Sequence, residues 1–181
     1  MANQDSPLGF RLFRHGGKRA PTVIARAVLA GRTHDLMVGD AYNVNGDDVI
    51  RTPAGTRASG IVVGIDLAPK SGSSQGPESQ DYIPAADAGI ILGCEDPDAE
   101  FEVQFDEAYD ADTHLGQTFD LINTDGNQAL AQSRQELDAS TVHASNGEFR
   151  LIGTVDRVDN DLTLADCQVV VRLVNPGPDP T

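Results

Sequence analysis

The chain of 181 residues contains no tryptophan and only two cysteines, Cys94 and Cys167. The cysteines are far apart and neither has a second metal ligand at a usual spacing, so we expect buried free thiols rather than a disulfide framework or a zinc site. No apolar run approaches the roughly 18 residues of a membrane-spanning helix, and the first residues lack the apolar centre of a signal peptide. We therefore expect a protein that is made in a cytoplasm and has no membrane partner.

The sequence also lacks a complete catalytic pattern. Ser74 is the central residue of a Gly-x-Ser-x-Gly match, but a nucleophile elbow joins a strand to a helix, whereas Ser74 lies in a loop rich in glycine and serine. The four histidines, His15, His34, His114 and His143, are scattered without the His-x-x-x-His spacing of a zinc site. We expect no enzyme activity, no cofactor and no metal centre.

Basic residues are scarce, with 13 Lys and Arg against 28 Asp and Glu and a net charge of −15. Such a negative field repels phosphate backbones, so we expect no nucleic-acid partner. The charge is uneven, because residues 1–35 contain six basic and two acidic residues. This asymmetry predicts an extended basic N-terminal arm over residues 1–20, attached to an acidic body.

The sequence consists largely of short apolar runs separated by turn residues. Asn45-Gly46 and Asn146-Gly147 are typical of hairpins with type I′ turns, in which both central residues need positive φ. Residues 60–65 are apolar on both faces, which predicts a buried strand, and residues 167–174 are apolar at most positions, which predicts a central strand. About eight to ten short strands with almost no helix predict an all-β barrel or sandwich. We expect a single β-rich domain over residues 21–175, followed by a Pro-rich tail over 176–181.

The most distinctive stretch, residues 81–105, joins two apolar runs through the acidic segment 95–98. Residues 101–105 alternate between apolar and polar side chains, which predicts a half-buried strand. Pro97 lacks an N–H donor and fixes its own φ, so segment 95–98 cannot continue a strand and is expected to be a turn.

Nine acidic residues lie within residues 95–112. Carboxylate oxygens are the ligands that calcium prefers, at about six to eight per ion. Neither Asp110-x-Asp112 nor residues 123–126 complete the order of an EF-hand loop, which needs a glycine in mid-loop. A solvated acidic face and a calcium-dependent β-rich adhesin or carbohydrate-binding module both stay open as interpretations.

The order of several motifs along the chain resembles the head decoration proteins of tailed bacteriophages, also called cement, stabilisation or auxiliary capsid proteins. The resemblance lies in residues 10–15 (FRLFRH), 38–44, 60–64, 91–104, 136–141 (ELDAST) and 149–174. It implies a non-enzymatic, mostly β virion structural protein on the outer capsid surface. Such proteins bridge subunits of the major capsid protein, stabilise the head and often assemble as trimers.

From this resemblance we expect the major capsid protein as partner and a homo-oligomer, with a trimer favoured, after synthesis in the host cytoplasm. The basic arm supplies the expected capsid-binding residues, which are Phe10, Arg11, Phe13, Arg14 and Arg19. Extended main chain could add strand-like hydrogen bonds to the capsid. Exposed ionic contacts of this kind weaken as salt rises.

Overall fold

The computed structural model describes residues 3–15, 20–66, 82–143 and 147–174, without the side chains of His15 and His143. The described elements are β1 (Arg11–His15), β2 (Val23–Val28), β3 (Leu36–Met37), β4 (Ala41–Asn45), β5 (Asp48–Arg51), β6 (Gly60–Asp66), β7 (Tyr82–Ile83), β8 (Gly89–Cys94), β9 (Ala99–Phe105), α1 (Ala111–His114), β10 (Thr118–Ile122), β11 (Glu136–His143), β12 (Phe149–Thr154) and β13 (Cys167–Leu173). The predicted all-β class is confirmed, with more strands than expected. Within the described residues, no helix is long and apolar enough to cross a membrane.

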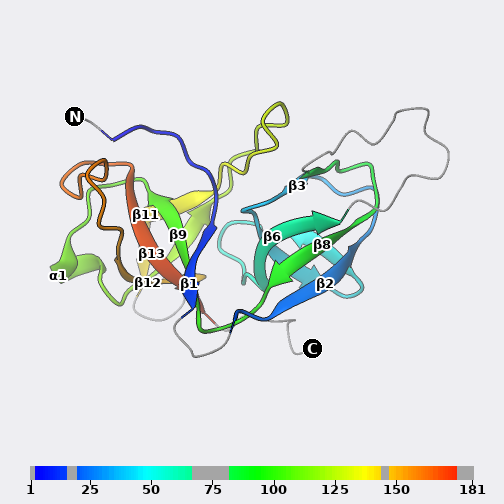
Figure 1. Ribbon diagram of the computed structural model, residues 1–181, viewed down its shortest axis with the longest axis horizontal. Coiled ribbons are helices and arrows are strands. Elements are labelled where there is room, and N and C mark those ends of the chain that lie inside the picture. The colour runs from blue at the N-terminus through cyan, green and yellow to red at the C-terminus, as the bar shows by residue number, and fades with distance from the viewer. Residues whose placement is uncertain (1–2, 16–19, 67–81, 144–146, 175–181) are drawn as a thin grey trace.

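Five strands close into a barrel, seen on the left of Figure 1. The first sheet has the order β1-β9-β11-β10-β12-β13, and a further pairing of β9 with β13 completes the ring. Its neighbours pair antiparallel except β9 and β11, which meet in parallel at Phe105 and Leu137. Strand β1 is outside the ring, paired antiparallel with the beginning of β9. Among the described residues β1 pairs with no other strand, so it is an edge strand.

Strand β9 is buried on both faces, which corrects the prediction of a half-buried strand. Its inward side chains, Phe101, Val103 and Phe105, are fully buried in the barrel, as their alternation predicts. Its outward side chains, Glu100, Glu102 and Gln104, are also buried, with at most 6% of each residue exposed. The alternation signals only which residues share a face of the sheet, and side chains from distant segments cover the polar face.

The second sheet has the order β2-β8-β6-β4-β5, and β3 pairs with β7 beside it. The predicted hairpin at Asn45-Gly46 is confirmed, because β4 and β5 pair from Asn45 and Asp48 onward. Its central residues are Gly46 and Asp47, and Gly46 has φ 60° whereas Asp47 does not have a positive φ. That pattern fits a type II′ turn rather than the expected type I′. Asn146 lies outside the described residues.

Tyr42 explains why two glycines lie in adjacent strands of this sheet. A Cβ atom built on Gly93 would be 2.0 Å from the Tyr42 hydroxyl, and one on Gly60 would be 2.6 Å from it. The buried hydroxyl donates to Oε1 of Glu95 at 2.7 Å, and Arg26 donates to both oxygens of the same carboxylate at 2.8 and 2.7 Å. The carboxylate of Glu95, the first residue of the acidic segment, is thus paired with Arg26 and Tyr42 at the point where β8 ends.

The apolar core of the described residues has two clusters, and the larger one spans both sheets. Its larger cluster combines barrel residues with Ala41, Ala58, Ile61 and Cys94 of the second half. The acidic segment 95–98 forms the predicted turn between β8 and β9 and carries the chain from one half to the other (Figure 1). Cys94 and Cys167 are both free and buried, as predicted. Strand β13, predicted as central from its apolar run, lies between β12 and β9. Strand β6, predicted as a buried strand, is buried at Gly60, Ile61 and Val62 and half-buried at the three residues that follow.

Candidate functional site

Phe10 lies in the protein core, not on an exposed arm. Only 2% of the residue is exposed, and its ring stacks on Phe149 with ring centroids 4.4 Å apart. Its backbone N–H donates to the carbonyl of Gly39 at 2.8 Å. Residues 3–15 of the predicted arm lie on the barrel and end in β1 (Figure 1). Phe10 therefore offers no surface to a partner, which corrects its assignment as a capsid-binding residue.

Arg11 and Arg14, on β1, pair with two buried glutamates of β9. Arg11 Nη2 is 2.8 Å from Oε1 of Glu102, and Arg14 Nε donates to Glu100. Two further arginines from later in the chain bind the same glutamates. Arg157 Nη1 is 2.8 Å from Glu102, and Arg172 Nη2 is 2.6 Å from Glu100. Each glutamate is thus shared by two arginines.

This pairing keeps Glu100 ionised. Burial pushes the pKa of Glu100 up, but hydrogen bonds from Arg172 and Arg14 outweigh burial and hold the pKa below its usual value. The side chain of Arg14 is nevertheless 66% exposed and that of Arg11 is 48% exposed. Arg11 and Arg14 therefore bind the buried carboxylates while much of each arginine side chain faces solvent.

Phe13 lies beside these charges on the surface and is 42% exposed. The guanidinium of Arg14 lies over its ring, 5.6 Å from the centroid. Phe13 and Arg14 line a hollow of about 370 Å³ on the outer face of the barrel. The other lining residues are Glu102, Val170 and residues 152–157. Arg19, the last of the predicted capsid-binding residues, lies outside the described residues, as does Ser74.

The nine acids of residues 95–112 do not gather around one point. Glu95 binds Arg26 and Tyr42, and Glu100 and Glu102 bind the arginines described above. Asp106 accepts from the backbone N–H of Ala139 at 2.8 Å, where burial raises its pKa. Within these described residues, no three carboxylates approach closely enough to hold one ion. Local hydrogen bonds and ion pairs therefore account for much of this acidic stretch.

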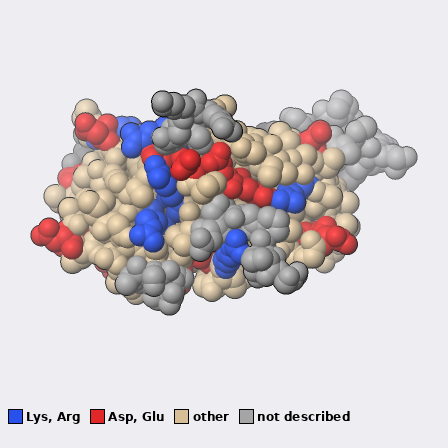
Figure 2. Space-filling model, turned by 90° about the horizontal axis from the view of Figure 1, so that it is seen from below, with Lys and Arg blue, Asp and Glu red and all other residues tan. Residues whose placement is uncertain are grey.

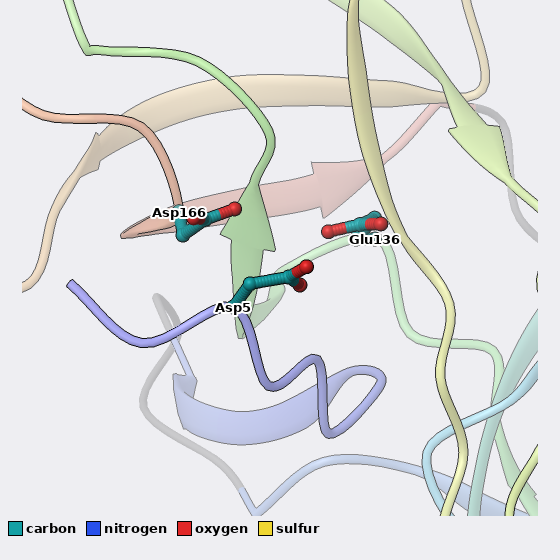
Figure 3. A group of neighbouring side chains, drawn as sticks. All are labelled: Asp5, Glu136 and Asp166. Carbon is teal, nitrogen blue, oxygen red and sulfur yellow. The ribbon is translucent and has the colours of Figure 1, made fainter.

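A different group of carboxylates does converge, and the sequence patterns miss it. Asp5, Glu136 and Asp166 point toward one another from three separate segments, with one oxygen of each within 4.8 Å of the others (Figure 3). Nε2 of the buried Gln104 donates to all three, at 3.3, 3.0 and 3.3 Å. The N–H groups of the Gln104 amide thus point at the three carboxylates and occupy the kind of position that a cation would take.

Crowding in this group alters its acidity. Burial, together with the charges of Asp5, Asp106 and Asp166, raises the pKa of Glu136 to about 7, against an opposing hydrogen bond from Gln104. Burial and the charge of Asp5 also raise the pKa of Asp166. The group joins Asp5 to residues more than 100 positions later in the chain, so only the folded structure reveals it.

Glu148 is a second buried carboxyl with a raised pKa. The residue is 5% exposed, and neither carboxylate oxygen has a hydrogen-bond partner among the described residues. Burial and the charge of Asp120 raise its pKa to about 8, although backbone N–H groups of Thr56, Leu121 and Gly55 lie near enough to favour the charged form. The raised pKa favours the protonated, neutral form of Glu148 near neutral pH.

Comparison with known proteins identifies no relative of this chain. A scan against protein-family models finds no match, and searches of the curated proteins and of the solved structures find none either.

Proposed function

We propose that this protein is a virion structural protein that binds the outer surface of a tailed-phage head. Its partner is the major capsid protein, whose neighbouring subunits it bridges and stabilises. The observation that carries the proposal is the surface of β1, where Arg11, Phe13 and Arg14 are exposed on an otherwise acidic all-β protein. The order of sequence motifs, which resembles that of head decoration proteins, supports the same function.

Charge favours the outside of a head over its inside. A protein with a net charge of −15 is repelled by packaged DNA, whereas the outer surface keeps it away from the phosphate backbone. Basic residues cluster locally, and Figure 2 shows Lys and Arg atoms over the barrel half of the face seen from below. A local basic surface on an acidic body suits attachment to one face of a partner.

Bridging also explains how weak contacts could stabilise a shell. A homo-oligomer, with a trimer favoured, presents the same surface several times, and linked sites bind far more tightly than one site alone. We propose no enzymatic step and assign no catalytic residue or cofactor. The alternative is a calcium-dependent adhesin or carbohydrate-binding module, and the dispersal of the acids in residues 95–112 speaks against it.

The proposal is tested by mixing the purified protein with empty expanded heads assembled from the major capsid protein of the same phage. We expect the protein to sediment with the heads and to saturate at a fixed ratio to the capsid subunit. A protein that stays in the supernatant at all ratios and at low salt would contradict the proposal. Deleting residues 1–20 is not a clean test of attachment, because the deletion also removes the core residue Phe10.

A further inference from the structure

We propose that the outer face formed by β1, β9, β13 and β12 docks an acidic segment of a protein partner, with a carboxylate bound between Arg14 and Arg157. The inference rests on the proposed function, in which the partner is the major capsid protein. The face, called the arginine face below, is defined by five arginines, Arg11, Arg14, Arg150, Arg157 and Arg172.

Strand pairing brings these arginines together. Arg11 is opposite Glu102 on β9, and Glu102 is opposite Val170 on β13. Arg172 of β13 is opposite Arg150 of β12. Two like charges directly opposite each other on a sheet are unfavourable, and here Glu100 offsets the repulsion by binding Arg172. The register therefore places Arg11, Arg172 and Arg150 on one outer face of the barrel.

The balance of charge on the arginine face differs from that of the whole chain. Near the hollow, the five arginines lie among four carboxylates, Glu100, Glu102, Asp156 and Asp159, whereas acids outnumber bases by 28 to 13 in the sequence. Three further carboxylates, Asp5, Glu136 and Asp166, lie farther along β9 around Gln104. Two of the four carboxylates are buried under the arginines, and Asp159 is 82% exposed, 3.5 Å from Arg157. The face is thus basic relative to its surroundings, which favours an acidic partner.

The arginines remain accessible although they are paired. The side chains of Arg14, Arg11 and Arg157 are 66%, 48% and 39% exposed. A guanidinium has five N–H donors in a planar fork, so one that already binds a glutamate can bind a second carboxylate. The buried glutamates hold the guanidinium groups in place, which lowers the entropy lost on binding.

The hollow adjoining Arg14 and Arg157 supplies the apolar part of the site. Phe13, Ile152 and Val170 line it together with these arginines. Aromatic residues and arginine are the residue types enriched at protein interfaces and at their energetic centres. An acidic side chain next to an apolar one fits this combination, whereas a nucleic acid would be repelled by the net charge.

The test uses substitutions that leave each buried glutamate with one arginine. Arg14→Gln leaves Arg172 on Glu100, and Arg157→Gln leaves Arg11 on Glu102. Arg134→Gln is the matched control. Arg134 is exposed in the segment before β11, so its substitution removes the same charge at a position away from the face. Asp156→Asn tests the sign of the effect, since it removes an acid from the rim of the hollow.

Binding is measured with a fluorescent poly-glutamate peptide at low salt, with a DNA duplex as the competing class of ligand. We expect the double variant R14Q/R157Q to bind the peptide about tenfold more weakly than the wild-type protein, because two partly exposed ionic contacts are lost. Arg134→Gln should not change the affinity, and Asp156→Asn should raise it. Equal peptide binding by the double variant and the control, or tighter binding of the duplex than of the peptide, would overturn the inference.

Binding to heads separates this inference from the proposed function. If the wild-type protein sediments with heads and R14Q/R157Q does so equally well, the arginine face is not the docking surface while the function stands. If the wild-type protein does not bind heads but the peptide results are as expected, the function fails and the face recognises an acidic segment of another protein. Both the double variant and the control must unfold at the same urea concentration as the wild-type protein for the comparison to hold.

Discussion

Phe10 belongs to a segment whose charge predicts an exposed arm, yet its ring is packed on Phe149 in the core. Its neighbours Arg11 and Phe13, in β1, have substantial exposure, so consecutive residues of one segment serve the core and the surface. Local sequence cannot separate these roles, because Phe10 and Phe13 have the same residue type and similar basic neighbours. What separates them is contact with a residue 139 positions away.

Replacing Phe10 with alanine should lower the free energy of unfolding by about 3–5 kcal/mol, because it leaves a cavity in a fully packed core. Phe13→Ala is the matched control, and because Phe13 is 42% exposed it should cost much less. Urea denaturation of both variants gives the comparison. If both cost the same, residues 3–15 do not lie on the barrel as described.

At the scale of elements, the sequence predicts strands better than it predicts their partners. The apolar runs at β6 and β13 and the acidic turn before β9 follow from periodicity and from the missing N–H of Pro97. The pairing of β1 with β9 joins residues about 90 positions apart, and nothing in a local period of two specifies it. The arginine face and the group formed by Asp5, Glu136 and Asp166 depend on such pairings, so neither could be predicted.

Glu148 lies where the start of β12 meets the turn at Gly55 and Thr56, and it should make stability depend on pH. Its pKa is about 8 in the folded protein, above the ordinary value of 4.5, so between these values the folded state holds a proton that the unfolded state releases. Stability due to this group is therefore complete below about pH 4.5 and falls as the pH rises toward 8.

Glu148→Gln should remove this dependence, because the amide is neutral at every pH. We expect the variant to gain about 2–4 kcal/mol relative to the wild-type protein at pH 8 and much less at pH 5, because folding of the wild-type protein at pH 8 favours a proton on Glu148 that the unfolded state releases. Thermal melts at the two pH values measure the difference. An equal effect at both would mean that Glu148 does not titrate in this range.

At the scale of the whole molecule, the two halves share a core and most acids lie outside it. The calcium-dependent alternative predicts that the ion stabilises the folded protein, because a ligand that binds only the folded state raises the melting temperature. We expect no shift between calcium and chelator from the nine acids of residues 95–112, because they do not converge on one point. Among the described residues, a calcium effect would have to arise at the group formed by Asp5, Glu136 and Asp166. A rise of several degrees with calcium, absent with magnesium, would favour the alternative.

The central claim is that the protein occupies the outside of a phage head. A density map of purified virions tests it most directly, because it shows whether the protein is present and on which side of the shell. We predict density for the barrel and the second sheet on the outer surface, with the arginine face turned toward the major capsid protein. Virions that lack the protein, or that hold it inside among the DNA, would contradict the account.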